Sequence, residues 1–369
     1  MELSAVDYVW IAIIAVSIVF FVTPLVVRLA WRRQLLDVPG GHKGQDSPVP
    51  YLGGVVMVVG LSAAVVLLPS LKRGAWVPDE LLLILGLAVV LALVGLVDDL
   101  RGVSRLLRLL VEVGAAAAMF DSGVRVHMFS SDALDLAVTI LWIVGIINAF
   151  NLLDNMDGLT AGVSCIASLT FFVLALQNGQ DLVAALSLAV AGCALGFLRH
   201  NFHPATIYMG DAGALFLGFV LAVLGLKLRF DSAPQEVTFF VPIVTLGVAI
   251  FDTSLVTVAR LLHRRSPFLG ARDHTSHRLV YVGLSVRVAV GLIYIAAATL
   301  AWLAVIMSRL DGSTAYLLMG LVLTIGVLSA ALLGAVPIYE TSQRRRLMIR
   351  EVAKHDDHGG NQPYLQKPA

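Results

Sequence analysis

The sequence contains few charged residues. Asp, Glu, Lys and Arg make up only 14% of the 369 residues, whereas a soluble domain carries about 25%. Hydrophobic residues make up 58%, and the mean hydropathy is +0.87. A formal net charge of +1 gives no electrostatic basis for a nucleic-acid partner. This composition predicts an integral membrane protein.

Cysteine is also scarce, and familiar short motifs are missing. The two cysteines, Cys165 and Cys193, lie inside apolar runs, which excludes a disulfide or cysteine–metal framework. The phosphate-binding pattern GxxxxGK[ST] is absent. No basic residues precede the first apolar run, which is too long for a signal-peptide core, so we expect it to be retained as a membrane span.

Apolar runs fill most of the chain, and a spanning helix needs about 20 mostly apolar residues. The sequence therefore predicts an all-α, polytopic membrane protein with about 11 transmembrane helices. The expected spans are Tyr8–Leu29, Gly53–Leu68, Leu81–Val97, Leu106–Phe120, Leu134–Ile147, Leu159–Leu176, Leu182–Leu198, Ala212–Leu226, Phe239–Leu262, Val288–Ile306 and Tyr316–Val336.

Basic residues predict the orientation of these spans. With the N-terminus outside and the C-terminus in the cytoplasm, all but six of the 26 lysines and arginines fall on the inner side, as the positive-inside rule requires. We expect one transmembrane catalytic domain over residues 1–343. Residues 344–369, which are first basic and then polar, are expected to form a disordered cytoplasmic tail.

Polar clusters gather on the same predicted inner side. Asp98 and Asp99 end an apolar run, where two adjacent carboxylates repel each other and oppose the helix dipole. A cation or a shared proton would relieve this repulsion. The alternative is a solvated helix end paired with Arg101.

The segment NAFNLLDNMDGLTAG follows another apolar run. Asn151, Asp154 and Asp157 are spaced by three residues, so they share one face if the helix continues through them. Oxygen ligands of this kind suit Mg²⁺. Helix capping before Gly158 is the alternative.

Three further segments have the same mixed character. Asp211 precedes an apolar run, either as an N-cap or as a ligand. The segment Ser266–Leu279 contains Arg272, His274, His277 and Arg278, which suit phosphate oxygens better than zinc, although a plain basic surface loop is also compatible. The loop Asp37–Gly54, with His42 and Lys43, is either a phosphate contact or a connection.

Four motifs in this order, VDDLRG, NLLDNMDGL, YMGDAGALFLG and DHTSHRL, resemble the polyprenyl-phosphate N-acetylhexosamine-1-phosphate transferases of the MraY/WecA superfamily. The resemblance implies transfer of HexNAc-1-phosphate, most often GlcNAc-1-phosphate, from a UDP-sugar (UDP-HexNAc) to undecaprenyl phosphate with release of UMP. It also implies Mg²⁺, which Mn²⁺ can replace, and a site on the cytoplasmic face of the bacterial inner membrane, serving the first membrane step of cell-envelope polysaccharide synthesis. The part of Ser266–Leu279 that contains His274 and His277, which we call the histidine segment, looks closer to the WecA/TagO branch.

The resemblance also implies roles for individual residues. Asp98 would take a proton from the lipid phosphate, with Asp99 holding either that proton or the metal in place. Asp154 and Asp157 would complete the catalytic set, with Asp157 behind the metal ligands or on the nucleotide. The metal is assigned to Asp211, with Asn151 or Asp154 as the second contributor. The expected substrate contacts are Lys43, Asn148, Arg272, His274, His277 and Arg278.

Alternatives of other classes stay open from the sequence. An MraY-type transferase would use a UDP-MurNAc-pentapeptide donor, and a flippase would move the finished lipid. A secondary transporter would place its acids near the membrane midplane. An aspartyl-phosphate on Asp98 competes with direct attack. A homodimer is compatible with the sequence.

Overall fold

The protein is built almost entirely from helices. The computed structural model describes residues 3–38, 47–71, 78–230, 235–267 and 271–339. Within them, two short strands pair antiparallel, β1 (Leu36–Asp37) and β2 (Val49–Pro50). The helices are α1 (Ala5–Arg33), α2 (Gly53–Leu71), α3 (Asp79–Arg101), α4 (Arg105–Asp121), α5 (Asp132–Leu153), α6 (Leu159–Gln177), α7 (Asp181–Asn201), α8 (Gly210–Lys227), α9 (Gln235–Thr245), α10 (Gly247–Leu262), α11 (Thr275–Tyr281), α12 (Val286–Met307) and α13 (Gly312–Gly334). The predicted all-α class is confirmed.

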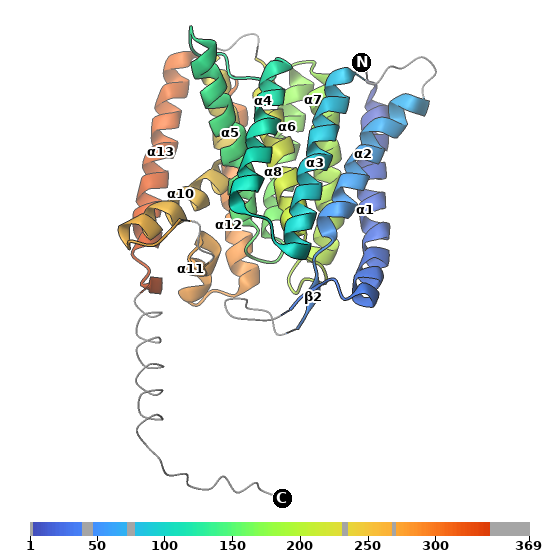
Figure 1. Cartoon of the computed structure of the whole chain (residues 1–369). Helices are drawn as coiled ribbons and strands as arrows, with labels where there is room; N and C mark the ends of the chain where they lie inside the picture. Colours follow the sequence, from blue (N-terminus) through green and yellow to red (C-terminus); the bar gives the residue numbers. More distant parts are fainter. Residues whose placement is uncertain (1–2, 39–46, 72–77, 231–234, 268–270, 340–369) are drawn as a thin grey trace, which may run out of the picture.

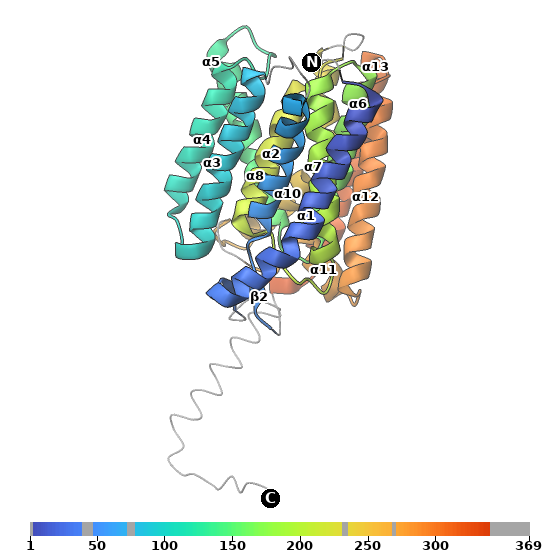
Figure 2. The same ribbon diagram turned by 90° about the vertical axis from the view of Figure 1, so that its right-hand side faces the viewer.

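Most of the long helices run side by side as one bundle (Figure 1). The chain begins at one end of the bundle, while β2 and α11 lie at the opposite end (Figures 1 and 2). We call this opposite end the polar end. It receives the C-terminal end of α3, the C-terminal end of α5 and the N-terminal end of α8.

Every expected span coincides with a helix or a helix pair. Eight helices in the described segments are long and apolar enough to cross a membrane, and the bent pair α9–α10 is a ninth candidate. Two of the expected spans correspond to shorter helices, α2 with its apolar part Gly53–Val66 and α4 with 17 residues. The polytopic architecture is confirmed, while the count of 11 crossings and their orientation stay predictions.

The prediction that Phe239–Leu262 forms one continuous span is wrong, because the helix is broken. The axes of Phe239–Thr245 and Gly247–Leu262 differ by 72°. Leu246 closes α9 by donating its N–H to the carbonyl of Pro242, and α10 restarts at Gly247, against which Leu300 packs. As a result α10 runs across the bundle rather than along it (Figure 1).

Helix α8 forms the centre of the bundle, and small residues let its neighbours come close. Every residue from Ala212 to Leu226 is buried. A Cβ added at Gly218 would lie 2.7 Å from the Cα of Ile147 in α5. A Cβ added at Gly95 of α3 would lie 2.5 Å from backbone atoms of Asp211 and Ala212. These close approaches bring the polar ends of α3 and α5 up to the first turn of α8.

Two sequence predictions fall on residues outside the described segments. Lys43, a predicted substrate contact, is one of residues 39–46, and the predicted tail 344–369 follows the last described residue. The described ends of the first loop, however, reach the polar end. The carbonyl of Pro50 accepts the N–H of Tyr208, and Gly53 donates to the carbonyl of Tyr208. The loop is thereby joined to the segment that leads into α8.

We expect Gly95→Ala to destabilise the protein, because the new methyl group would meet the backbone of α8. Overpacking of this kind costs about 1–3 kcal/mol, so the thermal midpoint in detergent should fall by several degrees. Gly86→Ala is the matched control, since it lies in the same helix with nothing within 4 Å of the added Cβ. A Gly95→Ala protein as stable as the Gly86→Ala protein would contradict this packing argument.

Candidate active site

The first carboxylates of the site come from α3. Asp99 accepts the backbone N–H groups of Asp211 (3.0 Å) and Ala212 (3.3 Å), so it caps α8 from a neighbouring helix. Asp98 accepts the N–H of Val103 at 2.7 Å, and its side chain stays 18% exposed. Asp99 therefore fixes the two helices together, while Asp98 keeps an accessible oxygen.

Arg108 lies at the centre of the polar side chains, and it is the residue that the sequence analysis missed. Its Nη1 lies 3.5 Å from Asp98 Oδ2 and 3.6 Å from Asp211 Oδ2. Its Nη2 donates to the side-chain oxygens of Asn148 and Asn151, both at 3.3 Å. One guanidinium thus joins side chains from α3, α5 and α8. The available signal was an arginine four residues before Glu112 inside a short apolar segment.

The asparagines of α5 face the same cluster. Asn151 Nδ2 donates to Asp211 Oδ1 at 2.7 Å. Asn148 and Asn151 lie on the same helical face, since both accept from Arg108. The expectation that this face continues to Asp154 and Asp157 is wrong, because α5 ends at Leu153 and Asp154 has non-helical backbone angles. Gly158, with φ of 76°, completes the turn into α6.

Asp154 lies half-buried in this turn, close to the other acids. Burial, together with the negative charges of Asp211, Asp99 and Asp157, raises the pKa of its carboxyl to about 7, against the opposing effect of a hydrogen bond from Thr160. The carboxyl of Asp154 can therefore exchange a proton near neutral pH.

Asp157 faces away from Arg108, towards the segment before α8. Its Oδ2 contacts Nδ1 of His203 at 2.8 Å and accepts the N–H of Ala205 at 3.0 Å. The next residue, Gly158, donates to Asn201, and its carbonyl accepts the hydroxyl of Tyr294. These bonds hold the turn after α5 and give Asp157 a bracing role there.

Helix α10 holds the histidine segment through Asp252. His274 is buried, and its Nδ1 lies 2.8 Å from Asp252 Oδ2, while Asp252 Oδ1 accepts the N–H of Thr275. The Ser276 hydroxyl donates to Asn155 Oδ1 at 2.5 Å. The ring of His277 lies 6.2 Å from the ring of His274. The segment is thus joined directly to the turn that carries Asp154.

The two arginines of this segment have different surroundings. Arg272 is exposed, whereas Arg278 is fully buried and donates to the carbonyls of Asp273 and Leu333, both at 2.8 Å. Burial opposes ionisation of Asp273, but its two hydrogen bonds from Arg260 and one from Tyr339 hold the pKa below its usual range. Through its bonds to the carbonyls of Asp273 and Leu333, Arg278 joins the histidine segment to the end of α13.

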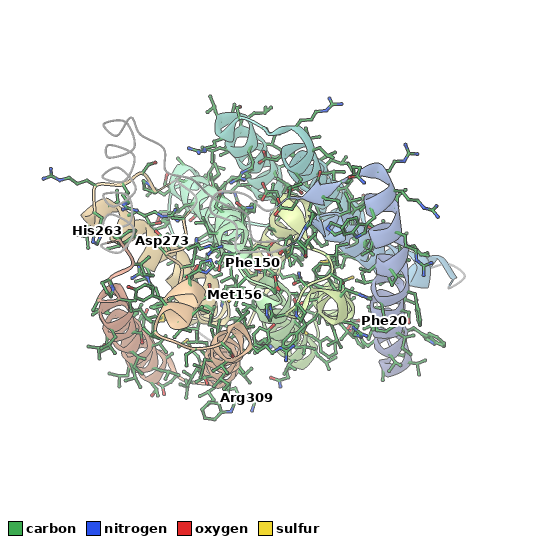
Figure 3. The ribbon with its side chains drawn as sticks, turned by 90° about the horizontal axis from the view of Figure 1, so that it is seen from below. Phe20, Phe150, Met156, His263, Asp273 and Arg309 are labelled. Atoms are coloured by element: carbon green, nitrogen blue, oxygen red, sulfur yellow. The ribbon has the colours of Figure 1, made fainter. Side chains whose placement is uncertain are left out.

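An apolar cavity of about 1030 Å³ adjoins the site. Its walls come from α9, α10, α12 and α13, and it reaches Leu153 and Ser276 beside the turn after α5. Seen from the polar end, Met156 of that turn lies near the middle of the bundle, and Asp273 lies between it and the edge marked by His263 (Figure 3). The polar cluster and an apolar compartment are therefore neighbours.

The donor set of the cluster fits a magnesium ion. In the described segments no three His, Cys, Asp or Glu side chains are grouped as a ready metal site. Mg²⁺ needs less, because it commonly binds one or two carboxylates together with substrate phosphates. Asp98 and Asp211 already share one cationic partner, and Asn151 contacts Asp211. Oxygen ligands of the kind that Mg²⁺ prefers are thus present.

The fold and the site define a polytopic membrane enzyme with an acidic centre at one end of its helix bundle. The family model described as glycosyl transferase family 4 matches residues 81–229. A probable undecaprenyl-phosphate N-acetylglucosaminyl 1-phosphate transferase of Bacillus subtilis is 36% identical over 295 residues, which cover 77% of this chain and 80% of the relative. The chain therefore belongs to glycosyl transferase family 4.

Two other relatives mark the breadth of the family. A decaprenyl-phosphate N-acetylglucosaminephosphotransferase of Mycolicibacterium smegmatis is 29% identical over 353 residues, 86% of each chain. A phospho-N-acetylmuramoyl-pentapeptide-transferase of Desulforudis audaxviator is 32% identical over 297 residues, 69% of this chain and 87% of the relative. The protein is thus similar to transferases of both branches.

We expect His277 to make stability depend on pH. Burial, with the positive charges of His274 and Arg272, lowers the pKa of His277 from 6.5 to about 4. The unfolded chain therefore takes up a proton as the pH falls below 6.5, whereas the folded protein does so only near 4. This contribution to stability is complete above pH 6.5 and is lost towards pH 4, by at most about 3 kcal/mol.

The test compares thermal midpoints from pH 7.5 to 4.5. The decrease at acidic pH should be smaller in His277→Gln than in the wild type. His127→Gln, at an exposed histidine between α4 and α5, should keep the wild-type slope. Equal slopes in all three proteins would contradict the prediction.

Proposed function

We propose that the protein transfers GlcNAc-1-phosphate from UDP-GlcNAc to undecaprenyl phosphate and releases UMP. The names of the relatives from Bacillus subtilis and Mycolicibacterium smegmatis support the sugar and the lipid class. The observation that carries the proposal is the position of Arg108 between two carboxylates, at the end of an apolar bundle and next to an apolar cavity. The reaction needs such a place, because two anionic phosphates must meet beside a lipid chain.

In this proposal a phosphate oxygen of the lipid attacks the β-phosphorus of the donor. The bond from that phosphorus to the bridging oxygen breaks, and UMP leaves with the bridging oxygen. Asp98 takes the proton of the lipid phosphate through its accessible oxygen. Arg108 offsets the negative charge that the two substrates bring, since a guanidinium suits phosphate oxygens.

Asp211 and Asn151 would hold Mg²⁺, for which Mn²⁺ can substitute. When bound, the metal neutralises donor diphosphate charge and polarises the β-phosphorus. Asp99 keeps Asp211 in place through the backbone of α8. Asp154 lies behind this group as a carboxyl that can hold or release a proton near pH 7.

The histidine segment binds the donor phosphates. His274 is oriented by Asp252, which leaves its other ring nitrogen for a ligand. His277 and the exposed Arg272 extend the same surface. Arg278 and Asn148 act by support, because their described bonds go to protein groups.

The polyprenyl chain lies in the apolar cavity, and the polar end faces the cytoplasm. The cavity has almost only apolar walls and reaches the turn after α5. The distribution of lysine and arginine supports the orientation. A plasma-membrane enzyme with this orientation draws its UDP-sugar from the cytoplasm.

The direct test is UMP release by the purified protein in detergent with undecaprenyl phosphate and Mg²⁺. We expect release with UDP-GlcNAc, and a loss of about 10²–10⁴-fold in kcat for Asp98→Asn, as for removal of a general base. Asp211→Asn should be similarly impaired. Asp132→Asn, whose side chain is 83% exposed in an ion pair with Arg125, is the control and should keep normal turnover.

The donor and the order of bond changes are read from the same assay. Release with UDP-MurNAc-pentapeptide and none with UDP-GlcNAc would replace the proposed sugar, as similarity to the Desulforudis relative allows. A phosphorylated enzyme, isolated after donor is added without lipid, would replace direct attack by a covalent step on Asp98. Near-normal turnover of folded Asp98→Asn would overturn the role of Asp98.

A further inference from the structure

A buried carboxylate lies directly behind Arg108, and no step of the proposed reaction uses it. Glu112 belongs to α4 and has no exposed surface. Its Oε2 accepts the side-chain amide of Asn148 at 2.5 Å, and its Oε1 lies 3.4 Å from Arg108 Nε. Oε1 has no hydrogen bond within the described segments. Glu112 therefore contacts the site only through two other residues.

Packing alone does not explain a carboxylate at this position. An ionisable group inside an apolar span is costly. A buried ion pair often stabilises no better than apolar side chains of the same volume. Glu112 faces the Nε side of the Arg108 guanidinium. The two Nη groups face the cluster instead, towards Asp98, Asp211 and the two asparagines.

The geometry of the guanidinium makes Glu112 an anchor. The group is planar and rigid, so holding Nε towards Glu112 fixes the directions of Nη1 and Nη2. Nη1 then points to Asp98 and Asp211, and Nη2 to Asn148 and Asn151. Glu112 also holds the amide of Asn148, which leaves the oxygen of Asn148 free to accept from Arg108.

We propose that Glu112 is a positioning residue that anchors Arg108 and Asn148, and thereby sets how tightly the cluster of Asp98, Asp211 and Asn151 binds a divalent cation. The inference rests on the metal site of the proposed function. With Glu112 present, its carboxylate partly neutralises the positive charge of Arg108 and restrains the guanidinium from moving closer to Asp98 and Asp211. Without that charge, Arg108 pairs more strongly with Asp98 and Asp211, and a metal ion competes less well for them.

The test measures Mn²⁺ binding to the purified full-length protein by electron paramagnetic resonance, without substrates. We expect Glu112→Gln to raise the Kd for Mn²⁺ about ten-fold or more, since a negative charge near the ion is lost and a positive charge is released. The matched control is Asp135→Asn. Asp135 is a buried carboxylate of α5 that accepts backbone N–H groups of Met128 and Phe129, about 20 Å along the helix from Asn148. Its Kd should stay within two-fold of the wild type.

A double-mutant cycle separates positioning from a simple charge effect. In an Arg108→Gln background, the additional Glu112→Gln change should alter the Kd far less than it does in the wild type, because the residue through which Glu112 acts is gone. Equal effects in both backgrounds would overturn the positioning role. Thermal midpoints confirm folding, and Glu112→Asp, which keeps the charge but withdraws it from Arg108, serves as a second variant with an intermediate Kd.

The outcomes distinguish this inference from the proposed function. If Asp211→Asn abolishes Mn²⁺ binding but folded Glu112→Gln keeps the wild-type Kd, only the role of Glu112 fails. If the wild type binds no Mn²⁺, or Asp211→Asn binds it normally, the metal site of the proposed function fails, and this inference fails with it.

Discussion

Mutual repulsion of carboxylates at the end of an apolar bundle is the constraint on which this site depends. Asp98, Asp99 and Asp211 meet where α3 and α8 cross, and like charges this close are stable only with compensation. Two features compensate them. The N–H groups at the start of α8 donate hydrogen bonds to Asp99, and Arg108 lies against Asp98 and Asp211. The remaining negative charge is the physical basis of the proposed cation site.

The same cluster depends on close helix packing, which small residues permit. An Asp side chain is short, so carboxylates from two helices meet only where the backbones nearly touch. Gly95 and Gly218 allow this on two sides of α8. Within a membrane, close packing of small residues also replaces the hydrophobic effect as a source of helix association. Stability and site assembly thus rest on the same contacts.

The sequence was sufficient to predict the apolar helices and to bring Asp98, Asp99 and Asp211 to the same end of them, because both follow from local patterns. Apolar runs predict helices, and polar residues at their ends predict a shared face once orientation is known. It was insufficient where the outcome depends on three dimensions. The end of α5 at Leu153 depends on the turn that Gly158 allows, so Asp154 and Asp157 left the expected helical face. The central position of Arg108 depends on its long side chain, which contacts residues of neighbouring helices. Residue spacing along the sequence does not predict such contacts.

The break between α9 and α10 is the clearest case of such a tertiary effect, and it serves two purposes at once. A straight helix would have directed Asp252 and Arg260 along the bundle. The 72° bend brings them under the histidine segment, where Asp252 contacts His274 and Arg260 pairs with Asp273. Residues of α9 and α10, on both sides of the bend, also line the apolar cavity that reaches Ser276. A single interruption of one helix therefore supports the histidine segment and lies beside an apolar compartment, and the proposed joining of a water-soluble donor to a lipid requires both.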